Sequence, residues 1–325
     1  MKLKSAKCIT KRPEPVFSYK DVPYNAALTF NAGVIKHNGK YIMMFRNDAG
    51  SIEEQKLNGV TNIGLSESAD GIHWNTYEKP VFEVHDGEIN RVYDPRLTVI
   101  DGEVYICFAA DTMHGIRGGI GKVSADFKSV EILSLSVPDN RNMALFPQKF
   151  NGKFVRLERP MPIYGTSWRS KGTFDIWLSE SPDLVYWGNS KLVLSCEEVP
   201  FCNDKIGPGA PPVKTDEGWL AIFHSVIYDE NCGKNGWEDE WKKKYYVGIM
   251  LLDKDDPSKV IGMSKEPLLA PELDFEISGG FRDEALFPCA MILDDNNEVK
   301  IYYSAGDKVV CLATADVHDL IALCK

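Results

Sequence analysis

Several features that would assign this chain of 325 residues to a class at once are missing from its sequence. It contains no run of about 18 apolar residues, the length that a membrane-spanning helix needs, so we expect no membrane partner. The first 17 residues are basic but have no apolar core, and they do not resemble a secretory signal. Acidic residues outnumber basic ones by 47 to 37, and the net charge of −10 argues against a nucleic-acid partner.

A zinc-type cysteine motif is also missing. None of the eight cysteines shows C-x-x-C spacing, and nothing else in the sequence demands a metal or an organic cofactor. Cys107, Cys289 and Cys311 fall inside predicted strands. Buried free thiols in a reducing compartment explain this usage, so we expect a cytoplasmic protein.

What the sequence does contain is a strand-turn-strand pattern that recurs five times. Each copy is an alternating apolar run, a turn centred on Asn-Gly, Asp-Gly, Glu-Gly or Asn-Asn, and a second apolar run. Such turn residues accept the positive φ that tight hairpins require. The copies span residues 33–46, 95–109, 144–159, 211–224 and 288–303.

A second repeat interleaves with the first. IGLSESADGIHW at 63–74 is matched by IWLSESPDLVYW at 176–187, with weaker versions at 247–260 and 309–320. Each is predicted to supply a third strand, a turn and an outer fourth strand, with its Ser, Asp and Trp residues serving the turn and the packing. Repeats of four strands are typical of propeller blades.

The repeats follow one another without a Ser/Gly-rich or charged linker. The sequence therefore predicts an all-β, five-bladed β-propeller that forms a single domain over residues 1–325. The N-terminal segment is predicted to enter it as an edge strand after Pro15.

Polar residues stand just before or at the ends of the repeated hairpins. Because inner strands of a propeller converge on a central channel, we expect these side chains to meet at one mouth of that channel. They are Asn31, Arg46, Asp94, Arg141, Arg159, Lys205, His224 and Asp307.

Asp94 is the most specific of them, since Pro95 removes a backbone donor beside it. The alternative is that Asp94 only pairs with Arg91 or Arg96.

Arg141 and Arg159 together suggest a fork for an anion with several oxygens, because guanidinium groups bind phosphate in a bidentate manner. The alternative is that they form ion pairs with Asp139 and Glu158.

For two further residues and one loop, the sequence allows both a functional and a structural role. Lys205 lies in a Pro- and Gly-rich corner at 203–212 that is either a cation site or structural, and His224 is either a ligand or a satisfied core histidine. The loop at 230–246 is either a lid, with Trp237 or Trp241 stacking on a sugar, or a solvated helical excursion.

Taken in order, these motifs resemble glycoside hydrolase family 130, the β-mannoside phosphorylases. The resemblance covers essentially the whole chain and rests on eight segments. They are FNAGVIKHNGKYIMMFR, RVYDPRLT, ALFPQKFNGKFVRLERP, NDKIGPGAPPV, FHSV, YYVGIMLLDKDDPSKVIG, the FP of ALFPCAMI, and IYYSAGD. The fold of that family is a five-bladed propeller, which agrees with the count of repeats.

The resemblance implies phosphorolysis: inorganic phosphate attacks the anomeric carbon of a terminal β-mannosyl unit and releases α-mannose 1-phosphate with inversion. It implies that Asp94 is the general acid. It places phosphate on Arg141, Arg159, Lys205, His224 and Tyr245, and mannose on Asn31, Arg46 and Asp307. Phosphate is a co-substrate here, and no cofactor is implied.

Elementary chemistry agrees with this reading. An inverting hydrolase needs two carboxylates, one of which activates water. A phosphorylase can omit the second, because phosphate is already anionic and needs positioning more than deprotonation. One Asp facing a set of cations therefore favours a phosphorylase over a mannoside hydrolase.

The sequence departs from its relatives in the acceptor region. Asp283 and Glu284 replace Asn or an apolar residue, Ala32 replaces Ser, and Gly306 replaces Ala. We expect some of Arg282, Asp283 and Glu284 to line the channel mouth and contact the acceptor sugar, with Asp283 setting the acceptor preference. The chain most resembles the subgroup that cleaves β-1,4-mannooligosaccharides, with β-1,2-mannobiose, mannosylglucose and mannosyl-N-acetylglucosamine as alternatives. A carbohydrate-binding propeller, an arabinan-type hydrolase and a homo-oligomer also remain open.

Overall fold

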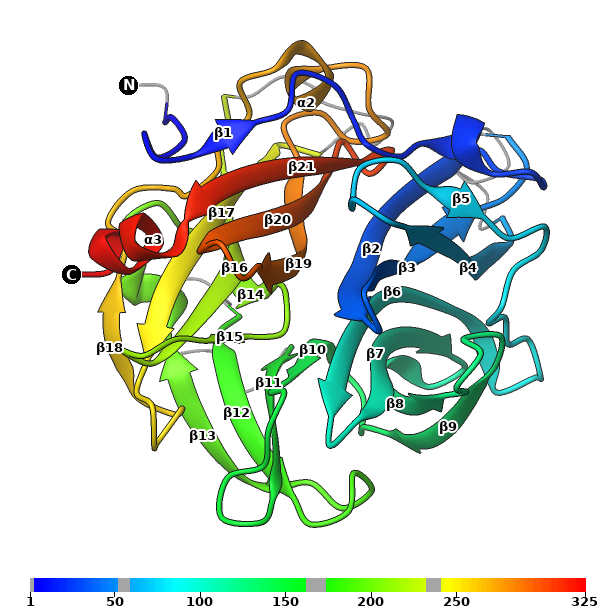
Figure 1. Cartoon of the computed structure of the whole chain (residues 1–325), viewed down its shortest axis with the longest axis horizontal. Coiled ribbons are helices and arrows are strands. Elements are labelled where there is room, and N and C mark those ends of the chain that lie inside the picture. The colour runs from blue at the N-terminus through cyan, green and yellow to red at the C-terminus, as the bar shows by residue number, and fades with distance from the viewer. Residues whose placement is uncertain (1–2, 52–58, 162–173, 232–240) are drawn as a thin grey trace.

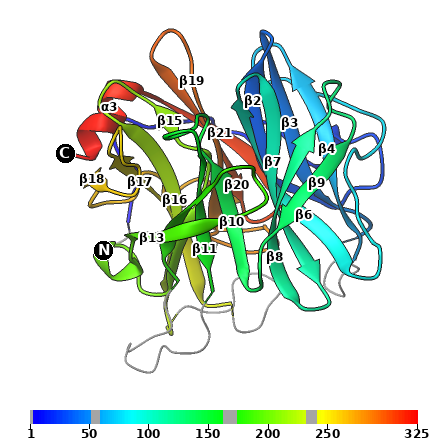
Figure 2. The same cartoon turned by 90° about the horizontal axis from the view of Figure 1, so that it is seen from below.

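The predicted five-bladed β-propeller is confirmed. The computed structural model describes residues 3–51, 59–161, 174–231 and 241–325, and it is nearly all β. Five small sheets are arranged around a common centre (Figure 1). A view from the side shows the sheets standing next to one another (Figure 2). The curved arrangement brings one inner strand from each sheet to the centre.

Each sheet is an antiparallel blade, numbered here in chain order. Blade 1 contains β2 (Leu28–His37), β3 (Lys40–Asp48), β4 (Thr61–Ser68) and β5 (Asn75–Thr76). Blade 2 contains β6 (Ile89–Ile100), β7 (Glu103–Thr112), β8 (Gly115–Val123) and β9 (Val130–Leu135). Blade 3 contains β10 (Asn140–Leu145), β11 (Phe154–Pro160), β12 (Ile176–Ser181) and β13 (Gly188–Leu194).

The remaining two blades are less regular. Blade 4 contains β14 (Lys205–Pro208), β15 (Val213–Lys214), β16 (Trp219–Tyr228), β17 (Lys243–Leu252) and β18 (Val260–Met263). Blade 5 contains β19 (Leu286–Leu293), β20 (Glu298–Ala305), β21 (Val309–Asp316) and β1 (Thr10–Lys11). The helices are short: η1 (Tyr19–Asp21), η2 (Cys196–Glu198), α2 (Asp274–Ile277) and α3 (Val317–Leu323).

Three of the five predicted hairpin turns have two residues at positive φ, while the turns at Gly218 and Asn297 have one each. Asn38 and Gly39 lie at φ of 49° and 77°, and the Asp-Gly and Asn-Gly turns of blades 2 and 3 have the same pair of positive angles. Two successive residues at positive φ match the strand twist in a tight hairpin. The second repeat also forms turns as predicted, with Ser68 and Asp70 receiving backbone N–H groups as Ser181 and Asp183 do.

The prediction for the last repeat was wrong. Residues 309–320 form β21 and then begin helix α3, and the outer strand of blade 5 is β1 from the N-terminus, which pairs with β21. The helix forms because Asp316 caps it and because its apolar residues 317, 320 and 321 recur at helical spacing and are buried. The N-terminal edge strand therefore lies before Pro15, and only a bridge from Phe17 to Val310 follows it.

The hydrophobic core is divided among the interfaces between blades. One cluster joins the faces of blades 4 and 5, another joins blades 3 and 4, and a third joins blades 1 and 2. Burial of these apolar faces fixes the blades against each other, which gives the channel mouth a rigid frame.

No helix in the described part of the chain is long and apolar enough to cross a membrane. Within the same residues, no group of three or more His, Cys, Asp or Glu side chains is placed to hold a metal ion.

Candidate functional site

Three inner strands carry the same β-bulge. In β2, β6 and β10, two residues oppose one residue of the neighbouring strand. The first bulged residue is Asn31, Asp94 or Asn142, at φ of 48°, 57° and 57°. Asn and Asp tolerate this left-handed backbone better than other side chains, and a bulge re-aims the residue that it contains. The repeated bulge thus places a polar side chain at the same level in each of three blades.

Asp94 is buried in a cationic setting, with 6% of its surface exposed. Asn31 Nδ2 donates to Asp94 Oδ1 over 2.8 Å, Arg46 Nη1 lies 3.4 Å from the same oxygen, and Arg141 Nη2 lies 3.9 Å from Oδ2. Burial raises the pKa of Asp94, but the surrounding cations, first of all Arg46, lower it more, so it ends below its ordinary value. In the ligand-free site Asp94 is a carboxylate.

Arg46 is held in place by contacts on three sides. Its guanidinium binds both oxygens of Asp48, at 2.8 and 2.9 Å, and lies over the rings of Phe30 and Tyr93. Burial lowers the pKa of Arg46, but the charges of Asp48 and Asp94 raise it above its ordinary value. Arg46 is therefore a fixed, permanently charged donor beside Asp94.

Cations from blades 3 and 4 crowd together on the other side of Asp94. Arg159 Nη1 lies 3.0 Å from Nε2 of His224, which is fully buried. Burial, helped by the charge of nearby Arg141, lowers the pKa of Arg159 to about 9. Burial also lowers the pKa values of Lys205 and His224 well below their ordinary range, with the charge of Arg159 as the next cause. A bound anion would relieve this crowding.

Unpaired buried nitrogen atoms point to the same conclusion. Within the described residues, Arg159 Nε, His224 Nδ1 and Asn142 Nδ2 have no hydrogen-bond partner. A buried donor without an acceptor is costly, so such a cluster favours a ligand with several oxygen atoms. Buried cations and unpaired nitrogens together suit phosphate.

Aromatic rings form one wall of the site. Tyr245 stacks on Trp241, with ring centres 5.6 Å apart, and on His224 at 6.0 Å. Lys205 Nζ lies 5.6 Å from the centre of the Tyr245 ring. Burial raises the pKa of the Tyr245 hydroxyl to about 12, so it remains a donor at neutral pH.

The segment at 279–288 reaches the site through Arg282. Phe281 and Arg282 donate their N–H groups to the carbonyl of Gly306, and Arg282 Nη1 lies 2.9 Å from Asp307 Oδ2. Gly306 has φ of 62°, and a side chain there would meet Gly280 at 2.9 Å. The glycine at this departure from the family pattern is thus explained by a close backbone approach.

A cavity of about 50 Å³ lies where these groups meet. It is lined by Asn31, Arg46, Asp94, Arg141, Trp241, Tyr245, Arg282, Ala285, Phe287 and Asp307. Arg159 and His224 adjoin it through the contacts with Tyr245 and Phe287. Eight sequence-predicted residues and Tyr245 are therefore brought together, while Asp283 is not among the lining residues.

The structure places Asp283 and Glu284 elsewhere. Asp283 Oδ1 accepts a hydrogen bond from the N–H of Gly280. Glu284 lies 3.2 Å from Lys244, in a different hollow. Of the segment 279–288, Arg282 rather than Asp283 faces the cavity.

The alternative pairings open to the sequence are not the ones observed. Arg91 pairs with Asp111, and Arg96 donates to the carbonyl of Gly209, so neither pairs with Asp94. Glu158 pairs with Arg156 and not with Arg159.

Asp139 accepts from the N–H of Ile116, with Arg141 directed to Asp94. Trp237 lies outside the described residues, as does most of the loop at 230–246.

Sequence reasoning missed Asn142. The signal that could have found it is positional, because Asn142 stands in β10 where Asn31 stands in β2 and Asp94 in β6.

Comparison with known proteins identifies the family. A family-wide sequence profile described as beta-1,4-mannooligosaccharide phosphorylase matches residues 2–325. The chain belongs to glycoside hydrolase family 130, as its motifs suggested.

Curated relatives of more than one linkage specificity match nearly the whole chain. It is 31% identical over 324 residues to a β-1,4-mannooligosaccharide phosphorylase of Ruminococcus albus, with 96% of this chain and 89% of that protein covered. It is 30% identical over 303 residues to a 1,2-beta-oligomannan phosphorylase of Thermoanaerobacter sp., with 91% and 93% covered.

The fold is shared with a solved structure. The β-1,2-mannobiose phosphorylase of Listeria innocua, in complex with β-1,2-mannobiose, superimposes with a TM-score of 0.81 at 24% identity. The match covers 97% of this chain and 99% of that one.

Proposed function

We propose that this protein is an inverting β-mannoside phosphorylase that uses inorganic phosphate to release α-mannose 1-phosphate. The observation that carries the proposal is one buried carboxylate, Asp94, facing a cluster of buried cations. The matched relatives are named as phosphorylases of β-mannosides, which supports the same reaction.

The site has two binding regions, one for phosphate and one for the mannosyl unit. Arg141, Arg159, Lys205 and His224 hold phosphate, with the Tyr245 hydroxyl as a further donor. Asn31, Arg46 and Asp307 hold the mannosyl unit at the cleaved bond. A phosphate oxygen attacks the anomeric carbon, the bond to the leaving sugar breaks, and Asp94 gives its proton to the leaving oxygen.

Asp94 must gain a proton before it can act as the acid. Its pKa is lowered in the free site partly by the charge of Arg141. A bound phosphate offsets that charge, and a bound sugar removes the remaining water, and both changes raise the pKa of a buried carboxyl. Substrate binding thereby favours the protonated acid.

A hydrolase is less well supported. Such an enzyme needs a second carboxylate to activate water. Among the described residues, the other carboxylate that lines the cavity is Asp307, which is paired with Arg282 at 2.9 Å. The position across from Asp94 is occupied by cations, which suit phosphate.

For substrate we propose β-1,4-mannooligosaccharides, on the description of the matching profile and on the sequence segments that resemble that subgroup. β-1,2-Mannobiose and mannosylglucose are the alternatives, because relatives with those names also match. A reducing cytosol is the proposed compartment, since the seven cysteines in the described residues are free thiols.

The test is phosphate dependence. β-1,4-Mannobiose should be consumed only when phosphate is present, with mannose 1-phosphate as product. Equal rates without phosphate, with free mannose as product, would contradict the proposal.

A further inference from the structure

Two cysteines in the segment between β13 and β14 have their sulfur atoms in contact. Sγ of Cys196 and Sγ of Cys202 lie 2.9 Å apart, and both residues are free thiols. A disulfide bond is about 2.0 Å long, so the two sulfur atoms need to approach by only about 0.9 Å to form one. The fold therefore holds a dithiol close to bonding distance.

The two thiols differ in exposure and in acidity. Cys196 has 1% of its surface exposed, whereas Cys202 is half-buried and can meet a reagent from solution. A hydrogen bond from the Cys196 thiol lowers the pKa of Cys202, and the same bond raises the pKa of Cys196. Because the thiolate is the reactive form of cysteine, Cys202 is suited to attack first and Cys196 to attack second.

Cys202 contacts the backbone that carries Lys205, one of the cations proposed for phosphate. Its thiol donates to the carbonyl of Lys205 over 3.2 Å and lies 3.5 Å from the carbonyl of Val226. Lys205 and Val226 are partners where β14 begins to pair with β16. The N–H groups of Asn203 and Asp204 also reach the carbonyl of Val226. The thiol thus holds the first residue of β14 in place.

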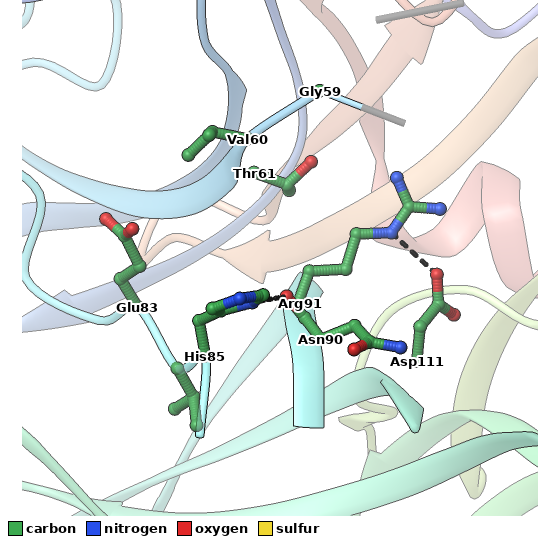
Figure 3. A pocket seen from close by; sticks show the side chains of 9 residues that line it. Gly59, Val60, Thr61, Glu83, His85, Asn90, Arg91 and Asp111 are labelled. Carbon is green, nitrogen blue, oxygen red and sulfur yellow. Dashed lines mark hydrogen bonds and ion pairs between the residues drawn. The ribbon is translucent and has the colours of Figure 1, made fainter. Parts of the chain in front are cut away.

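The mannose-binding region lies in other blades. Cys196 and Cys202 pack in the core between blades 3 and 4. Asp94 lies in blade 2, and the hollow between blades 1 and 2 contains the ion pair of Arg91 with Asp111 (Figures 1 and 3). A change at the two thiols therefore reaches the cations for phosphate before it reaches the groups for mannose.

We propose that Cys196 and Cys202 form a reversible disulfide by exchange with a small disulfide molecule, and that this bond weakens phosphate binding at Lys205. The weakening rests on the proposed phosphorylase function, whereas the disulfide does not. Oxidation removes the S–H donor from the carbonyl of Lys205 and draws Cys202 toward Cys196, so the start of β14 loses a contact. Disulfides in reducing compartments are usually transient and redox-sensing, which suits such a pair.

The exchange takes two steps. The thiolate of Cys202 attacks one sulfur of the small disulfide, which releases one small thiolate and leaves a mixed disulfide on Cys202. The sulfur of Cys196 then loses its proton to the solvent and attacks Sγ of Cys202, and the second small thiolate leaves. Two electrons pass from the protein to the small disulfide, and the two thiol protons end on the two small thiols.

The first experiment detects the bond directly. The full-length protein is incubated with oxidised glutathione at mildly alkaline pH, and its remaining thiols are then blocked with N-ethylmaleimide. Trypsin cleaves after Lys191 and Lys205, so one peptide, residues 192–205, contains both cysteines. Mass spectrometry should find this peptide two hydrogen atoms lighter and without either reagent, and dithiothreitol should reverse the change. N-ethylmaleimide on both cysteines, or glutathione that stays on the wild-type peptide, would overturn the proposal.

Serine variants test the order of attack. In Cys196→Ser, glutathione should remain on Cys202, because the second thiol is missing. In Cys202→Ser, the buried Cys196 should stay unmodified, and glutathione on it would overturn the order. Cys8→Ser is the matched control, since Cys8 is a half-buried free thiol elsewhere in the fold, and this variant should form the disulfide as the wild type does.

The second experiment compares the reduced and the oxidised enzyme in steady-state kinetics. KM for phosphate should rise about two- to tenfold on oxidation, because a hydrogen bond to the backbone of Lys205 is lost. KM for mannobiose of the linkage that the enzyme cleaves should stay the same. Cys202→Ser should not respond to oxidation, and its hydroxyl can still donate to the carbonyl of Lys205. An equal KM for phosphate in both wild-type forms would overturn the link to phosphate.

The two experiments separate this proposal from the proposed function. If the wild type fails to consume mannobiose with phosphate, the proposed function is wrong, and the mass of the peptide still decides the disulfide. Calorimetric binding of phosphate then replaces KM. Weaker binding by the oxidised protein supports the link between the disulfide and Lys205, and equal binding overturns it.

Discussion

Asn31 donates a hydrogen bond of 2.8 Å to Asp94 from the neighbouring blade, and both residues occupy the first position of the same bulge. Each has a backbone φ near 50°, which Asn and Asp accept. The bond favours the ionised form of Asp94 and adds to the effect of Arg46 on its pKa. The proposed acid is thus held in a fixed orientation in the free site.

Replacing Asp94 should lower the turnover rate and leave the affinity for phosphate nearly unchanged. We expect Asp94→Asn to lower kcat by about 10²- to 10⁴-fold, the range typical of a lost general acid. Steady-state kinetics and calorimetric phosphate binding check this. Near-normal turnover in Asp94→Asn would place the acid elsewhere, and Glu284, which pairs with Lys244, is not at the cavity.

Arg159→Ala should weaken phosphate binding. Loss of one charged hydrogen-bonding group is worth about 1.5–3 kcal/mol, so KM for phosphate should rise about 10- to 150-fold. Arg156 in the same strand is a matched control, because it bonds Glu158 and lies over Trp187. Arg156→Ala should lower the melting temperature without changing KM for phosphate. Equal effects of the two variants on KM would remove Arg159 from the phosphate site.

Phosphate binding should be accompanied by proton uptake by the protein. The pKa values of Lys205 and His224 are lowered by burial and by Arg159, so the free site holds fewer protons than isolated side chains would. An anion raises both values, and protons are taken up as it binds. At pH 8.5 free phosphate is already a dianion, so calorimetry in buffers of different ionisation enthalpy reports the protein alone.

Lys205→Arg provides the control for this uptake. Arginine remains charged at pH 8.5 in ordinary settings, so the variant should bind phosphate with less proton uptake than the wild type. Identical uptake in both proteins would show that Lys205 is already charged before phosphate binds.

The acceptor preference should depend on Arg282 more than on Asp283. Arg282 lines the cavity and binds Asp307, whereas Asp283 bonds the backbone of Gly280. In the synthetic direction with mannose 1-phosphate, Arg282→Ala should change the ranking of mannose, glucose and N-acetylglucosamine as acceptors. A larger change in Asp283→Ala would restore Asp283 as the acceptor contact.

The sequence predicted the structure best where a particular backbone conformation favours a particular residue type. The Asn-Gly and Asp-Gly turns formed because those residues tolerate positive φ, and the five strand-turn-strand repeats gave the number of blades. Polar residues at the ends of strands also predicted half of the cavity lining, namely Asn31, Arg46, Asp94, Arg141 and Asp307.

Two parts of the structure depended on partners that are distant in the chain. The direction of Asp283 is set by the approach of Gly280 to Gly306, which no local pattern reveals. The bulge at Asn142 is defined by its register against β11, so the residue was overlooked although Arg141 beside it was predicted.

The pairing of β1 with β21 has a consequence for folding. Thr10 pairs with Thr314, so blade 5 is completed by two strands that are about 300 residues apart in the sequence. Non-local pairings of this kind slow folding. Any folding intermediate that lacks either β1 or β21 therefore keeps blade 5 incomplete and the other strand unpaired at that edge.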